Sequence, residues 1–154
     1  MMEIKIVEID DYDKLVQILK QGFPKHSIFS KPDAEIIRYL EEYNSADDSF
    51  GLMYVDEGVK GCIFARPKIV AEGHTVWRFN HEVFADKEMA RMLVEEAERF
   101  ISEGLGTIKI ELGLAEPDKV NMFEALGYKK EGELENHYRF GETAVLMGKT
   151  LRGA

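Results

Sequence analysis

The sequence contains little of what stabilises a secreted protein or anchors a membrane protein. It has one cysteine, Cys62, one tryptophan and four prolines among 154 residues. A single cysteine forms no internal disulfide, which favours a reducing compartment. No apolar run approaches the roughly 20 residues that a membrane-spanning helix needs. Residues 1–10 (MMEIKIVEID) are acidic and alternating, unlike a signal peptide. We therefore expect a cytoplasmic protein without a membrane partner.

Positive charge is also scarce. The chain has 20 Lys and Arg against 29 Asp and Glu, a formal net charge of −9. Nucleic acids and anionic membranes attract basic surfaces, so this balance disfavours both as partners. The negative field suits a cationic or amine-bearing substrate better. The four histidines lack the i, i+4 spacing of a zinc site, so we expect no metal.

Apolar residues, by contrast, are abundant enough for one globular domain. They make up 45% of the chain, and charged residues make up 32%. A chain of this length and composition can bury a core of its own. Repeats, low-complexity tracts and linkers are not apparent in the sequence. We expect a single domain over residues 1–154.

Hydrophobic periodicity predicts the order of the secondary-structure elements. The expected strands are residues 3–8, 50–55, 59–66, 77–84, 107–112, 128–140 and 143–151. The expected helices are two between residues 10 and 45, one over 86–103 and one over 117–126. Pro67 is expected to end its strand or to place it at an edge.

The stretch 77–112 reads as strand, helix and strand, which implies two parallel strands joined by a crossover. The other strands come in antiparallel runs. The predicted fold is α/β (α+β mixed), with a mixed, mostly antiparallel sheet flanked by helices on both faces. Ligands of such sheets bind beyond the carboxyl ends of the strands, where a helix N-terminus can receive an anion. We expect a ligand near residues 84–90.

Two segments near the C-terminus carry a family resemblance. Residues 122–129 (MFEALGYK) are similar to an aromatic–Glu–Lys–Leu–Gly–Phe segment that forms a last helix and the following turn. Residues 132–134, Tyr138 and residues 146–151 (LMGKTL) are similar to a closing hairpin that ends in Met-x-Lys-x-Leu. With the element order, these segments resemble the GNAT superfamily of N-acetyltransferases over essentially the whole chain.

The resemblance implies transfer of an acetyl group from acetyl-CoA to an amine of a small molecule or peptide. It implies that main-chain groups at the end of the central strand hold the pantetheine arm. Amides at the start of the next helix would hold the pyrophosphate, because the helix N-terminus favours anions. The residues so implied for the cosubstrate are Val83, Phe84, Ala85, Lys87, Glu88, Met89, Ala90, Arg91 and Phe123.

Two positions depart from the family pattern. The family's loop reads approximately Arg/Gln-x-x-Gly-x-Gly/Ala, whereas residues 86–90 read DKEMA, in which only Ala90 matches. Asp86 and Glu88 would repel phosphates. Lys87 and Arg91 would partly offset that repulsion. Many members also carry a tyrosine that protonates the leaving thiolate, where this chain has Phe123, which cannot donate a proton.

Glu82 is the expected general base, since the incoming ammonium must lose a proton. Strand periodicity places Arg78, Asn80 and Glu82 on one face of a central strand, where a polar cleft would account for them. The alternative is a solvated face, or partners on neighbouring strands. His81, on the opposite face, is the alternative base. A hydrogen-bonded core histidine is its structural interpretation.

The loop over residues 23–30 either shapes an acceptor pocket or is an ordinary connection with Phe23 and Phe29 turned inward. Three hypotheses remain for the whole chain. The first is a GNAT-fold N-acetyltransferase. The second is a GNAT-fold binding or regulatory module without transfer activity, favoured by the altered loop and Phe123. The third is a homodimer that pairs through its last strand.

Overall fold

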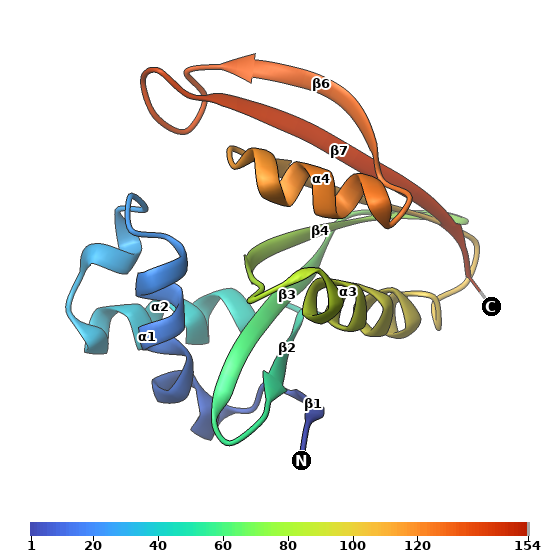
Figure 1. Cartoon of the computed structure of the whole chain (residues 1–154). Coiled ribbons are helices and arrows are strands. Elements are labelled where there is room, and N and C mark those ends of the chain that lie inside the picture. Colours follow the sequence, from blue (N-terminus) through green and yellow to red (C-terminus); the bar gives the residue numbers. More distant parts are fainter. Residues whose placement is uncertain (154) are drawn as a thin grey trace. The chain divides into compact units, whose positions relative to one another are not determined.

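A computed structural model describes residues 1–153 of the chain (Figure 1). The helices are η1 (Ile9–Asp11), α1 (Tyr12–Gly22), η2 (Ile28–Ser30), α2 (Asp33–Asn44), α3 (Lys87–Ile101) and α4 (Pro117–Ala125). The strands are β1 (Glu3–Ile6), β2 (Phe50–Val55), β3 (Val59–Ala71), β4 (His74–Val83), β5 (Thr107–Leu114), β6 (Lys129–Glu135) and β7 (Thr143–Arg152). The element order is the predicted one, with two short 3₁₀ helices added.

The strands form one sheet in the order β1-β2-β3-β4-β5-β7-β6. β4 and β5 pair in parallel, from His74 opposite Thr107 to Arg78 opposite Glu111. The pairs β1–β2, β2–β3, β5–β7 and β6–β7 are antiparallel. The prediction of a mixed, mostly antiparallel sheet with one parallel crossover is therefore confirmed.

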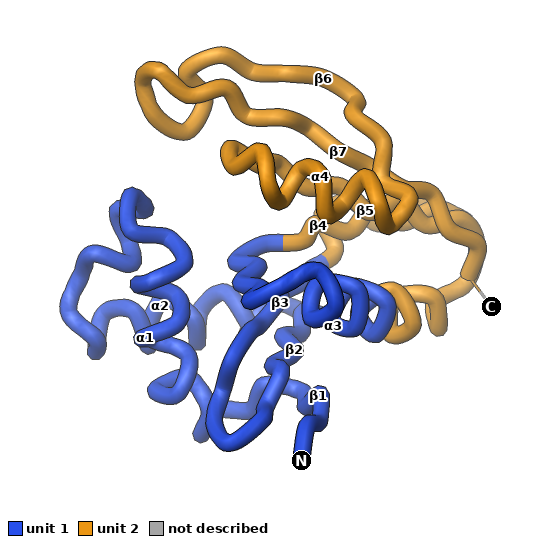
Figure 2. Tube along the Cα trace, viewed as in Figure 1, with its two compact units in different colours: residues 1–66, 80–97 blue, residues 67–79, 98–154 orange. Residues whose placement is uncertain are grey.

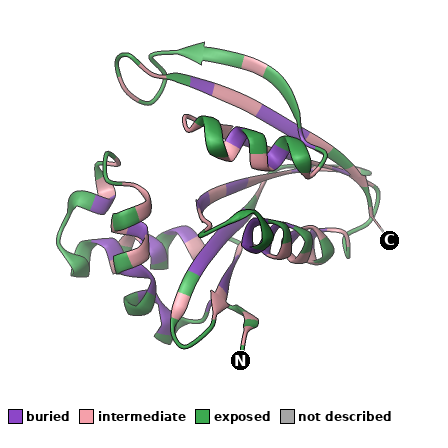
Figure 3. Ribbon diagram, viewed as in Figure 1, coloured by how far each residue is buried: buried purple, intermediate pink, exposed green. Residues whose placement is uncertain are grey.

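The chain divides into two compact units, which Figure 2 colours separately. Unit 1 contains residues 1–66 and 80–97. Unit 2 contains residues 67–79 and the chain from Glu98 onward. β3 and β4 each contribute residues to both units, and each unit has a buried core of its own (Figure 3).

Unit 1 has helices on both faces of its strands. On one face, side chains of α1 and α2 pack with Met53, Cys62 and Phe64 in a buried apolar cluster. On the other face lies Gly61, where a Cβ atom would meet the side chains of α3. Successive residues of a strand point to opposite faces, so β3 packs against α1 and α2 on one face and against α3 on the other. The prediction of helices on both faces holds within this unit.

Unit 2 is built on the alternation of β5, whose even-numbered residues from Ile108 to Leu114 are all buried. α4 begins at Pro117, a favoured first helical residue. It ends at Ala125, and Gly127, which follows the C-cap Leu126, has a φ of +93°. The N–H groups of Gly127 and Tyr128 then bond to the carbonyls of Glu124 and Phe123, a Schellman motif. This motif is the physical reason for the Leu-Gly-aromatic pattern in the sequence.

Several boundaries differ from the predictions by one or more residues. β3 continues through Pro67 to Ala71, so Pro67 does not end the strand. β6 ends at Glu135, because Asn136 has a φ of +53° and residues 136–142 form the connection to β7. α3 begins at Lys87, one residue after the predicted start, because Asp86 caps the helix from outside.

Candidate functional site

The end of β4 contains a backbone distortion at the position where the sequence predicts the site. His81 lies within the strand but has a φ of +54°, in the left-handed region that a non-glycine residue rarely adopts. Such a conformation costs roughly 1–3 kcal/mol and persists where the surroundings impose it. In a strand it re-aims the neighbouring side chains, as a bulge does.

The distortion changes which residues of β4 lie on the same face. Asn80 donates a hydrogen bond from Nδ2 to the hydroxyl of Tyr43 at 2.6 Å. His81 Nε2 lies 2.8 Å from the hydroxyl of Tyr39. Both tyrosines belong to α2, so two consecutive strand residues contact the same helix. The prediction that His81 and Asn80 lie on opposite faces is wrong here, because the left-handed φ interrupts the alternation.

His81 is buried, and aromatic rings surround its imidazole. The ring centroids of Phe23, Phe29, Tyr39 and Tyr43 lie between 5.1 and 6.3 Å from that of His81. Phe23 and Phe29 come from the loop over residues 23–30, so this loop packs against the end of β4. The side chains of Phe23 and Phe29 are therefore turned inward, against His81.

Glu82 is also buried, with 5% of its surface exposed. Burial raises the pKa of Tyr43 to about 12, and the negative charge of Glu82 adds a smaller rise. The guanidinium of Arg66 lies 4.5 Å from the centre of the Tyr43 ring and opposes the rise. A buried carboxylate therefore stands within electrostatic reach of Tyr43.

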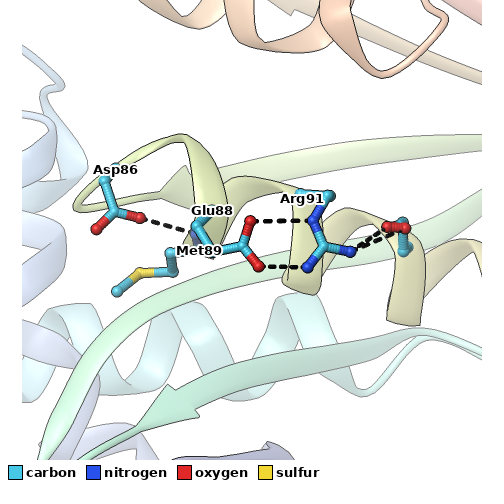
Figure 4. A network of polar contacts seen from close by, with 5 residues as sticks. Asp86, Glu88, Met89 and Arg91 are labelled. Atoms are coloured by element: carbon cyan, nitrogen blue, oxygen red, sulfur yellow. Dashed lines mark hydrogen bonds and ion pairs between the residues drawn. The ribbon is translucent and has the colours of Figure 1, made fainter.

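Residues 84–86 connect β4 to α3, and Asp86 caps the first turn of α3 (Figure 4). Asp86 Oδ1 accepts a hydrogen bond from the N–H of Met89 at 2.8 Å. The carbonyl of Asp86 accepts the N–H of Ala90 at 3.1 Å, which closes the first helical turn. Helix geometry provides no intrahelical acceptor for the N–H groups of Lys87 and Glu88. These two amides can bind an anion, while the carboxylate of Asp86 already serves Met89.

The charged side chains of this turn are paired along the helix. Arg91 contacts both oxygens of Glu88 and lies 2.7 Å from Glu95 Oε1 (Figure 4). These hydrogen bonds raise the pKa of the Arg91 guanidinium and, through Arg91, lower the pKa of Glu88. Arg91 therefore shares its positive charge with two carboxylates. Lys87, which is exposed, contributes a second cation to this turn.

Gly61 of β3 is a site residue that sequence reasoning missed. A Cβ atom at this position would collide with Met89 Sδ and lie 2.7 Å from the carbonyl oxygen of Val83. Met89 Sδ also lies 3.4 Å from the N–H of Ala85. Gly61 thus permits the close packing of the β4 end against the start of α3. An isolated glycine inside a predicted strand was the available signal.

Phe123 lies in unit 2 and is fully buried. Its ring centre is 5.1 Å from that of Tyr128, in an edge-to-face arrangement. The Tyr128 hydroxyl donates to Glu98 Oε2 at 2.7 Å, and Lys149 lies 3.0 Å from the same oxygen. Burial raises the pKa of Tyr128, and the charge of Glu98 raises it further. Both aromatic residues therefore serve the core, and Tyr128 retains its proton.

No group of three or more His, Cys, Asp or Glu residues within residues 1–153 is arranged to hold a metal ion. None of the described helices is long and apolar enough to cross a membrane.

Comparison with known proteins finds relatives that cover 96% of the chain. An N-alpha-acetyltransferase of Saccharolobus solfataricus is 26% identical over 161 residues, covering 96% of this chain and 92% of the relative. An N-alpha-acetyltransferase of Sulfurisphaera tokodaii is 24% identical with the same coverage. No protein-family model matches the sequence.

Solved structures share the fold. NAA60 of Arabidopsis thaliana, in complex with acetyl-CoA, superposes with a TM-score of 0.76 at 12% identity, covering 98% of this chain and 99% of that one. Aminoglycoside 6'-acetyltransferase type Ii superposes with a TM-score of 0.74 at 23% identity, covering 96% of each chain. At these identities the likeness establishes the fold, which is the GNAT fold.

Proposed function

We propose that this chain, a GNAT-superfamily N-acetyltransferase, transfers an acetyl group from acetyl-CoA to the α-amine at a polypeptide N-terminus. The observation that carries the proposal is the likeness to two relatives named N-alpha-acetyltransferase, which extends over 96% of the chain. The fold and the buried carboxylate at the end of β4 are consistent with it. The donor and the acceptor are the two parts that experiment must test.

The donor site of the proposal follows the end of β4 and the start of α3. Main-chain groups of Val83, Phe84 and Ala85 hold the pantetheine arm, as an added strand would. The N–H groups that open α3, those of Lys87 and Glu88 first, receive the pyrophosphate. The glycines typical of the family are absent, but main-chain amides bind phosphate whatever side chain they carry. The Lys87 ammonium adds attraction, and the Asp86 carboxylate opposes it.

Glu82 is the general base of the proposed reaction. It takes a proton from the substrate ammonium, directly or through a water molecule. The neutral amine then attacks the thioester carbonyl carbon, so a C–N bond forms as the C–S bond breaks. The departing thiolate takes a proton from water, since Phe123 has no hydroxyl and Tyr128 retains its own proton.

The acceptor carries a positive charge before reaction, which the net charge of −9 favours. A polypeptide N-terminus and a small-molecule amine both meet this requirement. The names of the sequence relatives favour the polypeptide. An aminoglycoside is the matched small-molecule candidate, because one structural neighbour is named for that substrate.

The test combines ¹³C-labelled acetyl-CoA with synthetic peptides that differ only in their first residue and carry one internal lysine. The same peptides with a blocked N-terminus, and an aminoglycoside, are the controls. Mass spectrometry should detect the label on the α-amine of free peptides, and Glu82→Gln should abolish most of it. Label on lysine or aminoglycoside alone would overturn the proposed acceptor. Coenzyme A binding without any transfer would indicate a binding module instead.

A further inference from the structure

The strained residue His81 is held by contacts from two neighbouring elements. From β3, the Cys62 thiol donates to the His81 carbonyl oxygen at 3.3 Å. From α2, the Tyr39 hydroxyl contacts His81 Nε2 at 2.8 Å. One contact fixes the backbone and the other fixes the side chain. An L-residue keeps a left-handed φ only where its surroundings determine it in this way.

The residue directly after this distortion is Glu82, the base of the proposed function. In a regular strand, Asn80 and Glu82 would share one face. With the distortion, Asn80 and His81 both contact α2, so the direction in which Glu82 leaves the backbone depends on the conformation of His81. A change of φ at His81 toward ordinary strand values would rotate the following peptide and move the carboxylate.

We propose that Tyr39 is a positioning residue, which acts through His81 to hold the carboxylate of Glu82 in its working orientation. This inference rests on the proposed function of Glu82. Tyr39 needs no contact with substrate in this role. Its hydroxyl holds the imidazole, the imidazole holds the left-handed backbone, and the backbone directs the base. Misplacing a reacting group by about 1 Å can lower a rate about 100-fold.

The surroundings of Tyr39 favour this role over simple packing. Burial raises the pKa of Tyr39, so its hydroxyl remains neutral and able to donate or accept a hydrogen bond. The Tyr39 and His81 ring centres are 5.4 Å apart and their planes meet at 70°. Phe29 packs 6.0 Å from Tyr39, at 86°. These edge-on contacts from separate elements limit the freedom of both partners of the hydrogen bond.

The test is Tyr39→Phe, which removes one hydroxyl and keeps the ring. With labelled acetyl-CoA and the best acceptor peptide of the panel, we expect kcat to fall about 10- to 100-fold while KM for both substrates stays within twofold. Tyr54→Phe, at a half-buried tyrosine of β2, is the matched control and should leave kcat unchanged. Tyr39→Phe that lowers only the unfolding temperature, with full kcat at 20 °C, would overturn the proposal.

A double-mutant cycle separates the positioning role of Tyr39 from the role of Glu82 as base. Tyr39→Phe should have no further effect in the Glu82→Gln background, because no base remains to be positioned. Equal further loss in both backgrounds would overturn the positioning role alone. Full turnover of Glu82→Gln would overturn the proposed base, and with it the role of Tyr39. Independently of activity, ¹⁵N spectra of Tyr39→Phe should shift the His81 imidazole and the Glu82 amide, and unchanged signals would contradict the proposal.

Discussion

Asp86 Oδ1 accepts a hydrogen bond from the backbone N–H of Met89 at 2.8 Å. The chain thus places a carboxylate of its own on one of the amides that open α3. An N-cap of this kind stabilises a helix by about 1 kcal/mol. At a site proposed for phosphate, the same carboxylate repels the ligand.

Asp86→Ser should therefore strengthen coenzyme A binding. Serine still caps the helix, but it carries no charge, so we expect about two- to tenfold tighter binding from the lost repulsion. Isothermal titration calorimetry at low salt measures it. Asp118→Ser, in the first turn of α4, is the matched control and should change nothing. Unchanged binding by Asp86→Ser would show that the ligand does not approach this turn, and weaker binding would contradict the repulsion.

Gly61→Ala should destabilise the protein and disturb the candidate site together. The added methyl group would collide with Met89 Sδ and approach the Val83 carbonyl oxygen to 2.7 Å. Overpacking of this kind costs about 1–3 kcal/mol, which urea unfolding measures. At Gly104, a methyl group would meet only a carbonyl oxygen at 3.5 Å, so Gly104→Ala is the control. Equal stability of both variants would contradict the packing described at Gly61.

Tyr128→Phe should lower stability and leave turnover unchanged. The Tyr128 hydroxyl donates to Glu98 at 2.7 Å in a partly buried pair, and its loss costs about 1–2 kcal/mol. If instead Tyr128 protonated the leaving thiolate, kcat would fall more than tenfold and the basic limb of its pH profile would change. Chemical denaturation and a pH profile of kcat distinguish the two outcomes.

Asp11 should make stability depend on pH in acid. Burial would raise the pKa of Asp11, but the N–H of Glu8 and the ammonium of Lys14 outweigh it and hold that pKa below its ordinary value. A lowered pKa contributes stability above the unfolded value, and this contribution is lost as the pH falls through the folded value. Asp11→Asn should therefore cost about 1–2 kcal/mol at pH 7 and less at pH 3.

Urea unfolding at both pH values measures this difference. Asp10→Asn, at the exposed neighbour, is the control and should be neutral at both. A loss that is as large at pH 3 as at pH 7 would show that the charge of Asp11 is not what stabilises the turn.

The order of elements and the parallel crossover could be predicted because they depend on local signals. Each signal is local in the sequence: the alternation along β5, Pro117 at the start of α4, and Gly127 after the end of α4. The left-handed His81 could not be predicted. Neither glycine nor asparagine marks it, and contacts from Tyr39 and Cys62, remote in sequence, impose it.

The capping role of Asp86 was partly predictable. The sequence indicated an acid at the start of the helix, and repulsion of phosphates followed from its charge alone. That its carboxylate engages the Met89 amide depends on where the helix begins, which hydrophobic periodicity does not determine to one residue. The extension of β3 past Pro67 could not be predicted either, because the length of a strand depends on its pairing with neighbouring strands.

The most direct test of the account is a titration of ¹⁵N-labelled protein with coenzyme A, followed by amide chemical shifts. The account predicts saturable shifts concentrated at residues 83–85 and 87–91, which report the pantetheine and the pyrophosphate. Absence of shifts at millimolar ligand, or shifts confined to other segments, would contradict the claim that these main-chain groups bind the cosubstrate.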